Sequence, residues 1–172
     1  MAAMTKTVIG RVNLWVSKTS DESECHGMKV LLQRVSHAEV AVAGETVGRI
    51  GAGLLLLVGV EKGDTGEQVR RMAEKLLDYR VFADTAGRMN LSVRETAGAL
   101  LVVSQFTLAA DTGSGRRPSF STAAEPTQAK ALYEDLVALL RAAELTVETG
   151  RFAADMQVSL VNDGPVTFLL ST

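Results

Sequence analysis

From Met28 onward, short apolar runs are separated by turn residues, and this pattern more than any other limits what the chain can fold into. The first run is rich in β-branched residues, and the second alternates between apolar and polar side chains. A turn at 43–45 and a glycine-flanked break at 51–53 punctuate the series. The runs cover residues 30–35, 38–42, 46–50 and 54–60. Runs of this length bounded by turn residues are typical of β-strands, so the segment predicts a meander of short strands.

The hydrophobic period then changes to that of helices in two places. Residues 64–67 resemble a capping box, with a side-chain acceptor at Asp64 and an acid, Glu67, three positions later. They predict a helix over residues 65–79, and Pro126, which suits an early helical position, opens a second over 126–143. The core stripes are Val69, Met72, Ala73, Leu76 and Leu77 in the first segment and Ala129, Leu132, Leu136, Leu139 and Leu140 in the second.

The remaining pattern is again β-rich. Short strands are expected at residues 81–82, 100–103 and 145–148, with a Gly-, Ser- and Arg-rich surface loop over 109–124. Two apolar runs, residues 156–161 and 166–170, flank an Asp-Gly pair and predict a terminal hairpin. The order of elements predicts an α+β fold: a barrel-like, mainly antiparallel β-sheet with two main helices in a single domain.

Residues 1–27 differ in character from the rest of the chain, because polar residues dominate and acidic ones gather near their end. Three interpretations stay open: a non-native start or attached tail, a disordered native extension, and a targeting peptide. The last is weakly supported, since the segment has few basic residues and no long apolar stretch. We expect an N-terminal extension over 1–27 and a folded domain over 28–172.

The residue inventory excludes several kinds of chemistry. The single cysteine, Cys25, cannot form an intrachain disulfide, which fits a reducing compartment. A Ser-His-Asp triad would need His26 or His37, and we expect His37 to be an exposed turn residue at the end of a strand. No Cys/His cluster has zinc spacing and no compact acidic cluster suggests magnesium, so we expect neither metal nor cofactor.

The charge pattern limits the partners. A net charge of −2 argues against a broad basic face for nucleic acid, although a protein that grips only the end of a nucleic acid would not need one. No apolar run approaches the roughly 20 residues of a membrane span. We therefore expect no membrane association and no DNA partner.

Three motifs combine residue types that chemistry uses. Gly164-Pro165 is either a plain turn or a rigid backbone reader, because Pro cannot donate to a strand ladder and X-Pro bonds adopt the cis form at low cost. The stretch 104–107, Ser-Gln-Phe-Thr, leaves a buried strand with two hydroxyls but no identifiable base, which disfavours a Ser or Thr nucleophile. Arg116 and Arg117 form either a phosphate-binding pair or a solvated loop pair.

Four stretches together resemble one family, the D-aminoacyl-tRNA deacylases of translational proofreading. They are residues 28–35 (Met-Lys-Val-Leu-Leu-Gln-Arg-Val), 104–108 (Ser-Gln-Phe-Thr-Leu), 115–120 (Gly-Arg-Arg-Pro-Ser-Phe) and 162–167 (Asn-Asp-Gly-Pro-Val-Thr). The resemblance spans residues 28–172, and Ala109, where many relatives carry an aromatic residue, is a minor departure that could alter the pocket rim.

The resemblance implies a cytoplasmic homodimer of barrel-like subunits with the active site at the subunit interface. Gly164 and Pro165 would form a cis dipeptide that enters the partner's pocket and excludes L-aminoacyl groups. The substrates would be D-aminoacyl-tRNA and glycyl-tRNA mischarged on tRNA-Ala, held by the 3′ end. Residues that would line the pocket are Ser104, Gln105, Phe106 and Thr107, with Phe152 and Met156 shaping it, Arg34 fixing the dipeptide, and Arg116 and Arg117 contacting the acceptor stem.

A mechanism without histidine fits this resemblance. The ester is already activated, and the neighbouring ribose 2′-hydroxyl can assist attack, so the protein would mainly orient the ester and stabilise developing charge. Two other classes remain open: a non-catalytic nucleic-acid or partner-binding module on the same fold, and a small-molecule or metal-dependent hydrolase, which the lack of ligand clusters disfavours.

Overall fold

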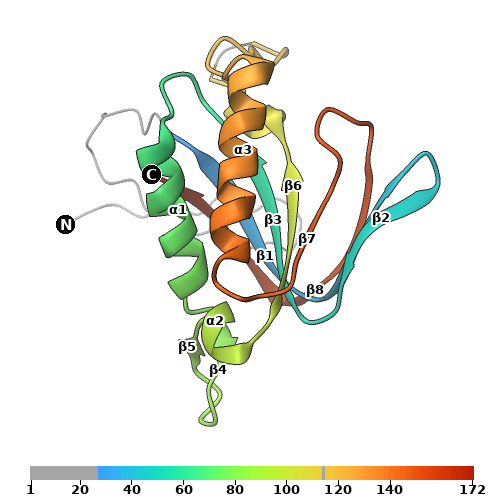
Figure 1. Cartoon of the computed structure of the whole chain (residues 1–172), viewed down its shortest axis with the longest axis vertical. Helices are drawn as coiled ribbons and strands as arrows, with labels where there is room; N and C mark the ends of the chain where they lie inside the picture. Colours follow the sequence, from blue (N-terminus) through green and yellow to red (C-terminus); the bar gives the residue numbers. More distant parts are fainter. Residues whose placement is uncertain (1–26, 114) are drawn as a thin grey trace.

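The first strand, β1 (Lys29–Val42), organises the sheet, because it has partners along both edges. The computed structural model describes residues 27–113 and 115–172 of the chain (Figure 1). One edge of β1 pairs along nearly its whole length with the last strand, β8 (Gln157–Ser171). The other edge pairs first with β3 (Gly53–Gly59) and then with β2 (Glu45–Ile50). The first and last strands of the described chain are therefore neighbours.

The sheet curls until its two ends approach each other. The strand order is β2-β1-β3-β6-β7, with β6 at Ala99–Ser104 and β7 at Val147–Thr149. The pairs made by β1 are antiparallel, whereas β3-β6 and β6-β7 are parallel. At the closure, a Cβ built on Gly48 of β2 would lie 2.6 Å from the carbonyl oxygen of Thr149 in β7. The predicted α+β fold with a barrel-like sheet in one domain is confirmed, and its sheet is mixed.

Two long helices, α1 (Gly66–Asp78) and α3 (Pro126–Arg141), lie side by side over one face of this sheet (Figure 1). Both were expected from the sequence. The short α2 (Val93–Thr96), the 3-10 turn η1 (Phe106–Ala109) and the small hairpin of β4 (Phe82–Ala83) with β5 (Met89–Leu91) complete the fold. Among the described residues, no helix is long and apolar enough to cross a membrane.

The capping box that opens α1 lies one residue later than predicted. Thr65 is the N-cap, and the backbone N–H of Thr65 donates to the side chain of Gln68 at 3.0 Å. Asp64 is instead buried and accepts a hydrogen bond from the N–H of Glu61 at 2.7 Å. Burial raises the pKa of the Asp64 carboxyl above its usual value. Because the Asp64 carboxylate already accepts this hydrogen bond from Glu61, it does not cap α1.

Alternation along the strands divides the core into two layers. In β3 and β6, residues such as Leu56 and Val102 face the helices and join one cluster with Met72 and Leu136. Their neighbours in sequence point inside the curled sheet and join a second cluster, which contains Val35, Ala38, Val40, Ile50, Leu55, Leu101 and Val103. Because the buried strands are apolar on both faces, they read as continuous apolar runs in the sequence.

The predicted terminal hairpin is wrong. Both of its apolar runs belong to the single strand β8, and both pair with β1. The register passes from Gln33 opposite Thr167 to Val35 opposite Asn162, so residues 163–166 bulge out opposite one residue, Arg34. Asp-Gly signals a chain reversal only when its flanking strands pair with each other, and here the long edge of β1 competes successfully for both.

The simple meander is also wrong, because β2 and β3 do not pair with each other but follow one another along the same edge of β1. Residues 30–35 and 38–42 are one strand, and the polar residues between them are exposed. His37 is thus exposed as predicted, yet it lies within a strand opposite Val161 rather than in a turn. The predicted extension, residues 1–27, lies outside the described residues apart from Gly27.

Candidate active site

A cavity of about 530 Å³ opens where β6 ends, bounded by the start of α3 and by the segment that leads into β8. It brings together five of the predicted site residues: Ser104, Gln105, Phe106, Phe152 and Met156. These residues come from two parts of the chain almost 50 positions apart. The fold therefore unites the stretch 104–106 with the stretch 152–156 in one concave surface, as ligand sites require.

Tight backbone packing holds the first wall. The N–H of Gln105 donates to the carbonyl of Val58 at 2.7 Å, which extends the β3-β6 pairing by one step before η1 begins. At Gly59 a Cβ would lie 2.8 Å from the Cβ of Leu108, so the turn after β6 rests directly on β3. This close approach presents Ser104 and Phe106 to the cavity on a rigid strand end.

The second wall, residues 152–156, is fixed from the middle of the molecule. The N–H of Gly150 donates to the Val102 carbonyl at 3.0 Å, and a Cβ on Gly150 would lie 2.6 Å from the sulfur of Met156. The N–H of Ala154 closes a turn on the carbonyl of Arg151 at 3.2 Å. Phe152 therefore lies within this tight turn, and Met156 follows two residues after it.

Tyr133 of α3 contacts both walls of the cavity, and the sequence did not predict it as a site residue. Its hydroxyl donates to the Val102 carbonyl at 2.8 Å, and its ring centroid lies 5.9 Å from that of Phe152. Burial raises the pKa of Tyr133 to about 12. Helical spacing from Ala129 and Leu136 could have placed Tyr133 in the core, but no signal marked it as a cavity residue.

Thr107 does not line the cavity. It is exposed on η1, and its hydroxyl accepts a short hydrogen bond from the side-chain amide of Gln105. Its only side-chain partner in the described part of the chain is therefore neither histidine nor carboxylate. The hydroxyl of Thr107 thus lacks the adjacent base that a nucleophile requires.

Gly164 and Pro165 lie on the exposed bulge of β8 and do not line the cavity of their own chain. The peptide bond between them is cis. Asn162 holds the bulge, because its side-chain oxygen accepts from the N–H of Val166 at 2.7 Å and its amide donates to the Thr167 hydroxyl at 2.8 Å. The sequence motif contains Asn162, but this brace was not foreseen.

Arg34 grips the bulge from the opposite strand. Its Nε donates to the carbonyl of Asp163 at 2.9 Å and lies 3.3 Å from the Asp163 carboxylate, while Nη1 donates to the Val81 carbonyl at 2.5 Å. A Cβ built on Gly164 would lie 3.1 Å from Nη2 of Arg34. The guanidinium therefore ties the bulge to the segment that precedes β4.

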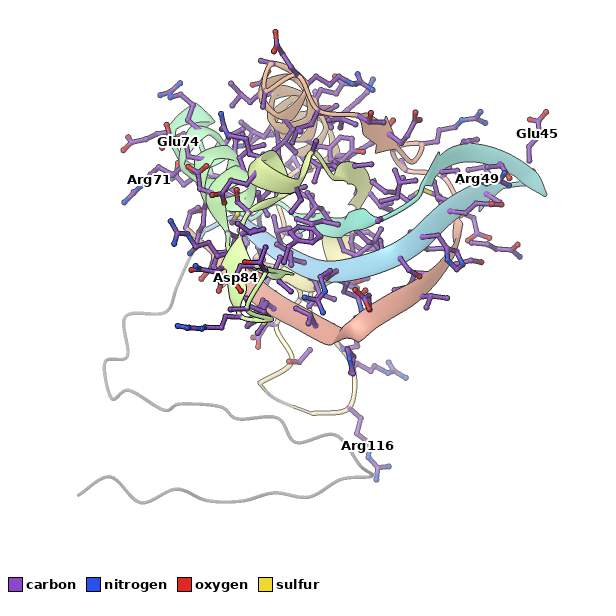
Figure 2. All side chains as sticks on the ribbon, turned by 90° about the horizontal axis from the view of Figure 1, so that it is seen from below. Glu45, Arg49, Arg71, Glu74, Asp84 and Arg116 are labelled. Atoms are coloured by element: carbon purple, nitrogen blue, oxygen red, sulfur yellow. The ribbon has the colours of Figure 1, made fainter. Side chains whose placement is uncertain are left out.

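Arg116 and Arg117 are exposed on the loop after η1, and Figure 2 shows Arg116 extending away from the body of the protein. The loop is connected to the cavity through two aromatic rings, since Phe120 lies 5.1 Å from Phe106, centroid to centroid. Within residues 27–113 and 115–172, no group of three or more His, Cys, Asp or Glu side chains is arranged to hold a metal.

The family model described as D-Tyr-tRNA(Tyr) deacylase matches residues 31–171, which is nearly all of the range that the structure describes. The chain belongs to the D-Tyr-tRNA(Tyr) deacylase family. This membership confirms the expected family and makes the chain a deacylase, an enzyme that cleaves an ester bond on tRNA.

Individual relatives of this deacylase agree in sequence and fold. A protein from Alcanivorax borkumensis named D-aminoacyl-tRNA deacylase is 63% identical over 143 residues, which is 83% of this chain and 99% of the relative. The solved structure of a c-Myc DNA Unwinding Element Binding Protein is 38% identical with a TM-score of 0.80, over 84% of this chain and 98% of that one. A probable eukaryotic D-amino acid tRNA deacylase shares the fold, with a TM-score of 0.75 and 18% identity over 84% of this chain and 99% of that one.

Proposed function

We propose that this deacylase hydrolyses the ester of D-aminoacyl-tRNA at the cavity that unites Ser104 and Phe106 with Phe152 and Met156. That union carries the proposal, because it joins two separate stretches of the family match, residues 104–106 and 152–156, into one concave site at a strand end. The 3′-terminal adenosine and the aminoacyl group would occupy the cavity, and the product would be free D-amino acid and tRNA. Arg116 and Arg117, on the loop anchored by Phe120, would contact phosphates of the acceptor stem.

The chemistry is substrate-assisted. Water attacks the ester carbonyl while the vicinal 2′-hydroxyl of the ribose assists, the bond to the 3′-oxygen breaks, and a proton passes to that oxygen. The hydroxyl of Ser104 and the side-chain amide of Gln105, both at the cavity, would donate hydrogen bonds to the charge that develops on the carbonyl oxygen. Support comes from Thr107, whose hydroxyl is paired with an amide rather than with a base.

The active unit is a homodimer in which Gly164 and Pro165 of one subunit enter the cavity of the partner. Two observations support this. The dipeptide is exposed and rigidly braced, yet it does not line the cavity of its own chain. Apolar residues flank it on the same strand, with Val161 48% and Leu169 60% exposed, as expected for a surface that a second copy covers.

In this arrangement the backbone carbonyls of Gly164 and Pro165 read chirality. They would occupy the space that an L side chain needs, whereas a D side chain points away. Glycine has no side chain to reject, so glycyl-tRNA, including glycine mischarged on tRNA-Ala, would also be cleaved.

The test compares hydrolysis of D- and L-tyrosyl-tRNA by the wild-type protein and by Gly164→Ala. Gly164 has φ 137°, and a Cβ there would lie 2.7 Å from a methyl carbon of Val166, so alanine must displace the bulge. Gly44→Ala is the matched control, since Gly44 also has positive φ but nothing within 4 Å. We expect cleavage of the D ester alone, and slower or less selective cleavage only in Gly164→Ala. Equal cleavage of both esters by the wild-type protein would end the chiral-reader proposal.

Thr107→Ala tests the chemistry. Because we assign Thr107 no covalent role, single-turnover cleavage should fall by no more than about tenfold, the size of one lost hydrogen bond in the transition state. Loss of essentially all activity from a folded variant that still binds substrate would show that Thr107 is the nucleophile.

A nucleic-acid-binding module is the second candidate, because the protein of a solved structure that is 38% identical is named a DNA Unwinding Element Binding Protein. The same hydrolysis assay separates the two. If a folded dimer cleaved neither ester, nucleic-acid binding without catalysis would replace the deacylase proposal.

A further inference from the structure

One formal charge stands out among the side chains of the cavity. Among the described residues that line it, Asp155 alone has a charged side chain, and most of the others are apolar. Asp155 is exposed, so it lies where the cavity meets solvent. Within the described ranges, no ion pair shorter than 4 Å involves its carboxylate.

The backbone on both sides of Asp155 is held in place. Asp155 directly follows the turn in which the N–H of Ala154 bonds to the carbonyl of Arg151 and Ala153 adopts φ 59°. Met156, the next residue, packs so closely on Gly150 that a Cβ there would lie 2.6 Å from its sulfur. A carboxylate that this backbone carries at the mouth of an apolar cavity is suited to select an occupant of opposite charge.

The proposed substrate offers one such group. The 3′ end of an aminoacyl-tRNA carries anionic phosphates, neutral hydroxyls and a neutral ester, and the one cation that every amino acid brings to it is the α-ammonium. A carboxylate facing phosphate would repel it, whereas a carboxylate facing an ammonium gains a charge-assisted hydrogen bond. The negative charge of Asp155 therefore indicates that it faces the ammonium group of the ligand rather than a phosphate.

We propose that Asp155 is a specificity-determining residue that binds the α-ammonium of the aminoacyl ester. This rests on the proposed function of the cavity. Its consequence is a discrimination that chirality does not provide: esters whose amino group is acylated, as in peptidyl-tRNA, lack the cation and bind weakly. Asp155 thereby directs hydrolysis to single amino acids and away from growing peptides joined to tRNA by the same bond.

The experiment measures binding by calorimetry, separately from hydrolysis. The probes are 3′-(D-tyrosylamino)-3′-deoxyadenosine, whose amide resists cleavage, and its N-acetyl derivative. In Asp155→Asn the dissociation constant of the free-amino probe should rise roughly three- to tenfold, the range for one partly exposed charge pair, and that of the acetylated probe by less than about twofold. The effect should shrink at high ionic strength.

Two variants make the test specific. Asp155→Glu keeps the charge and should bind the free-amino probe within about threefold of wild type. Asp135→Asn removes the same charge from the outer side of α3, where the residue is exposed and does not line the cavity, and should change neither constant. Equal weakening of both probes by Asp155→Asn, or an equal effect of Asp135→Asn, would overturn the assignment. Absent hydrolysis with a clear difference between probes would instead refute the deacylase reaction and leave the ammonium site standing.

Discussion

Replacing Arg34 by lysine tests whether the bulge of β8 is held by a specific guanidinium geometry. Arg34 is largely buried, with 14% of its side chain exposed, and it bridges two carbonyl oxygens, those of Asp163 and Val81. A lysine ammonium at the end of a single stem can reach one of these acceptors but not both. The variant therefore loses one charge-assisted hydrogen bond while keeping the positive charge.

The magnitude is set by that single bond. A hydrogen bond from a charged donor contributes about 1.5–3 kcal/mol, and the ion pair with Asp163 adds little because that carboxylate is 62% exposed. For a protein of this size, 1 kcal/mol corresponds to about 2–4 °C, so Tm should fall by roughly 3–12 °C. If the lost hydrogen bond reduces the free energy that holds Gly164 in place by the same amount, selectivity for D over L esters should fall about 10- to 100-fold.

Thermal unfolding and single-turnover hydrolysis of both esters provide the two readouts. Arg49→Lys is the matched control, because Arg49 is 68% exposed and pairs with Glu39 at the surface, and it should change stability by less than about 0.5 kcal/mol. If Arg34→Lys matched this control in Tm and kept full chiral selectivity, the idea that Arg34 positions the dipeptide would have to be given up.

Three further outcomes are expected. Replacing Arg116 and Arg117 together by glutamine should weaken binding of tRNA and lower the slope of log affinity against log salt by about 1 to 2; an unchanged slope would show that they do not meet phosphate. Gly53→Ala should destabilise by more than about 3 kcal/mol in urea unfolding, because its Cβ would lie 1.9 Å from the Ala99 carbonyl, whereas Gly51→Ala, in open space, should be neutral or slightly stabilising. Tyr133→Phe should cost only about 0.5–1.5 kcal/mol, because the Val102 carbonyl keeps its bond from the N–H of Gly150; a larger loss would mean that the hydroxyl supports more than this carbonyl.

The sequence predicted the elements better than their pairing. Helices α1 and α3 follow from apolar spacing, which is a local property of the chain. The bulge at residues 163–166 does not, because Asp-Gly-Pro carries the same turn signal whether the strands beside it pair with each other or with a distant third strand. The length of β1 decides between these two pairings. The sequence does not reveal that length, because Ser36 and His37 interrupt the apolar pattern of the strand.

The candidate site shows the same division. The stretches 104–107 and 162–167 were conspicuous because polar or unusual residues adjoin apolar runs. The cavity joins the first of them to residues 152–156, where the family resemblance, and no pattern in the residues themselves, had indicated Phe152 and Met156. The sequence did not predict Tyr133 and Asp155 as cavity residues, since a tyrosine in a helix and an aspartate in a loop are ordinary in any sequence. Their significance comes from the groups that they face.

The pairing of β1 with β8 has a consequence for how this protein is made. Lys29 lies opposite Ser171, so β1 must wait for β8, which is synthesised more than 100 residues later, before one of its edges is closed. During translation that edge of β1 stays open and able to pair wrongly with other extended chains. Contacts between residues so far apart in sequence also favour slow folding, because the intervening loop must close before any of them forms. The step that completes this edge of the sheet is thus postponed until β8 has emerged from the ribosome.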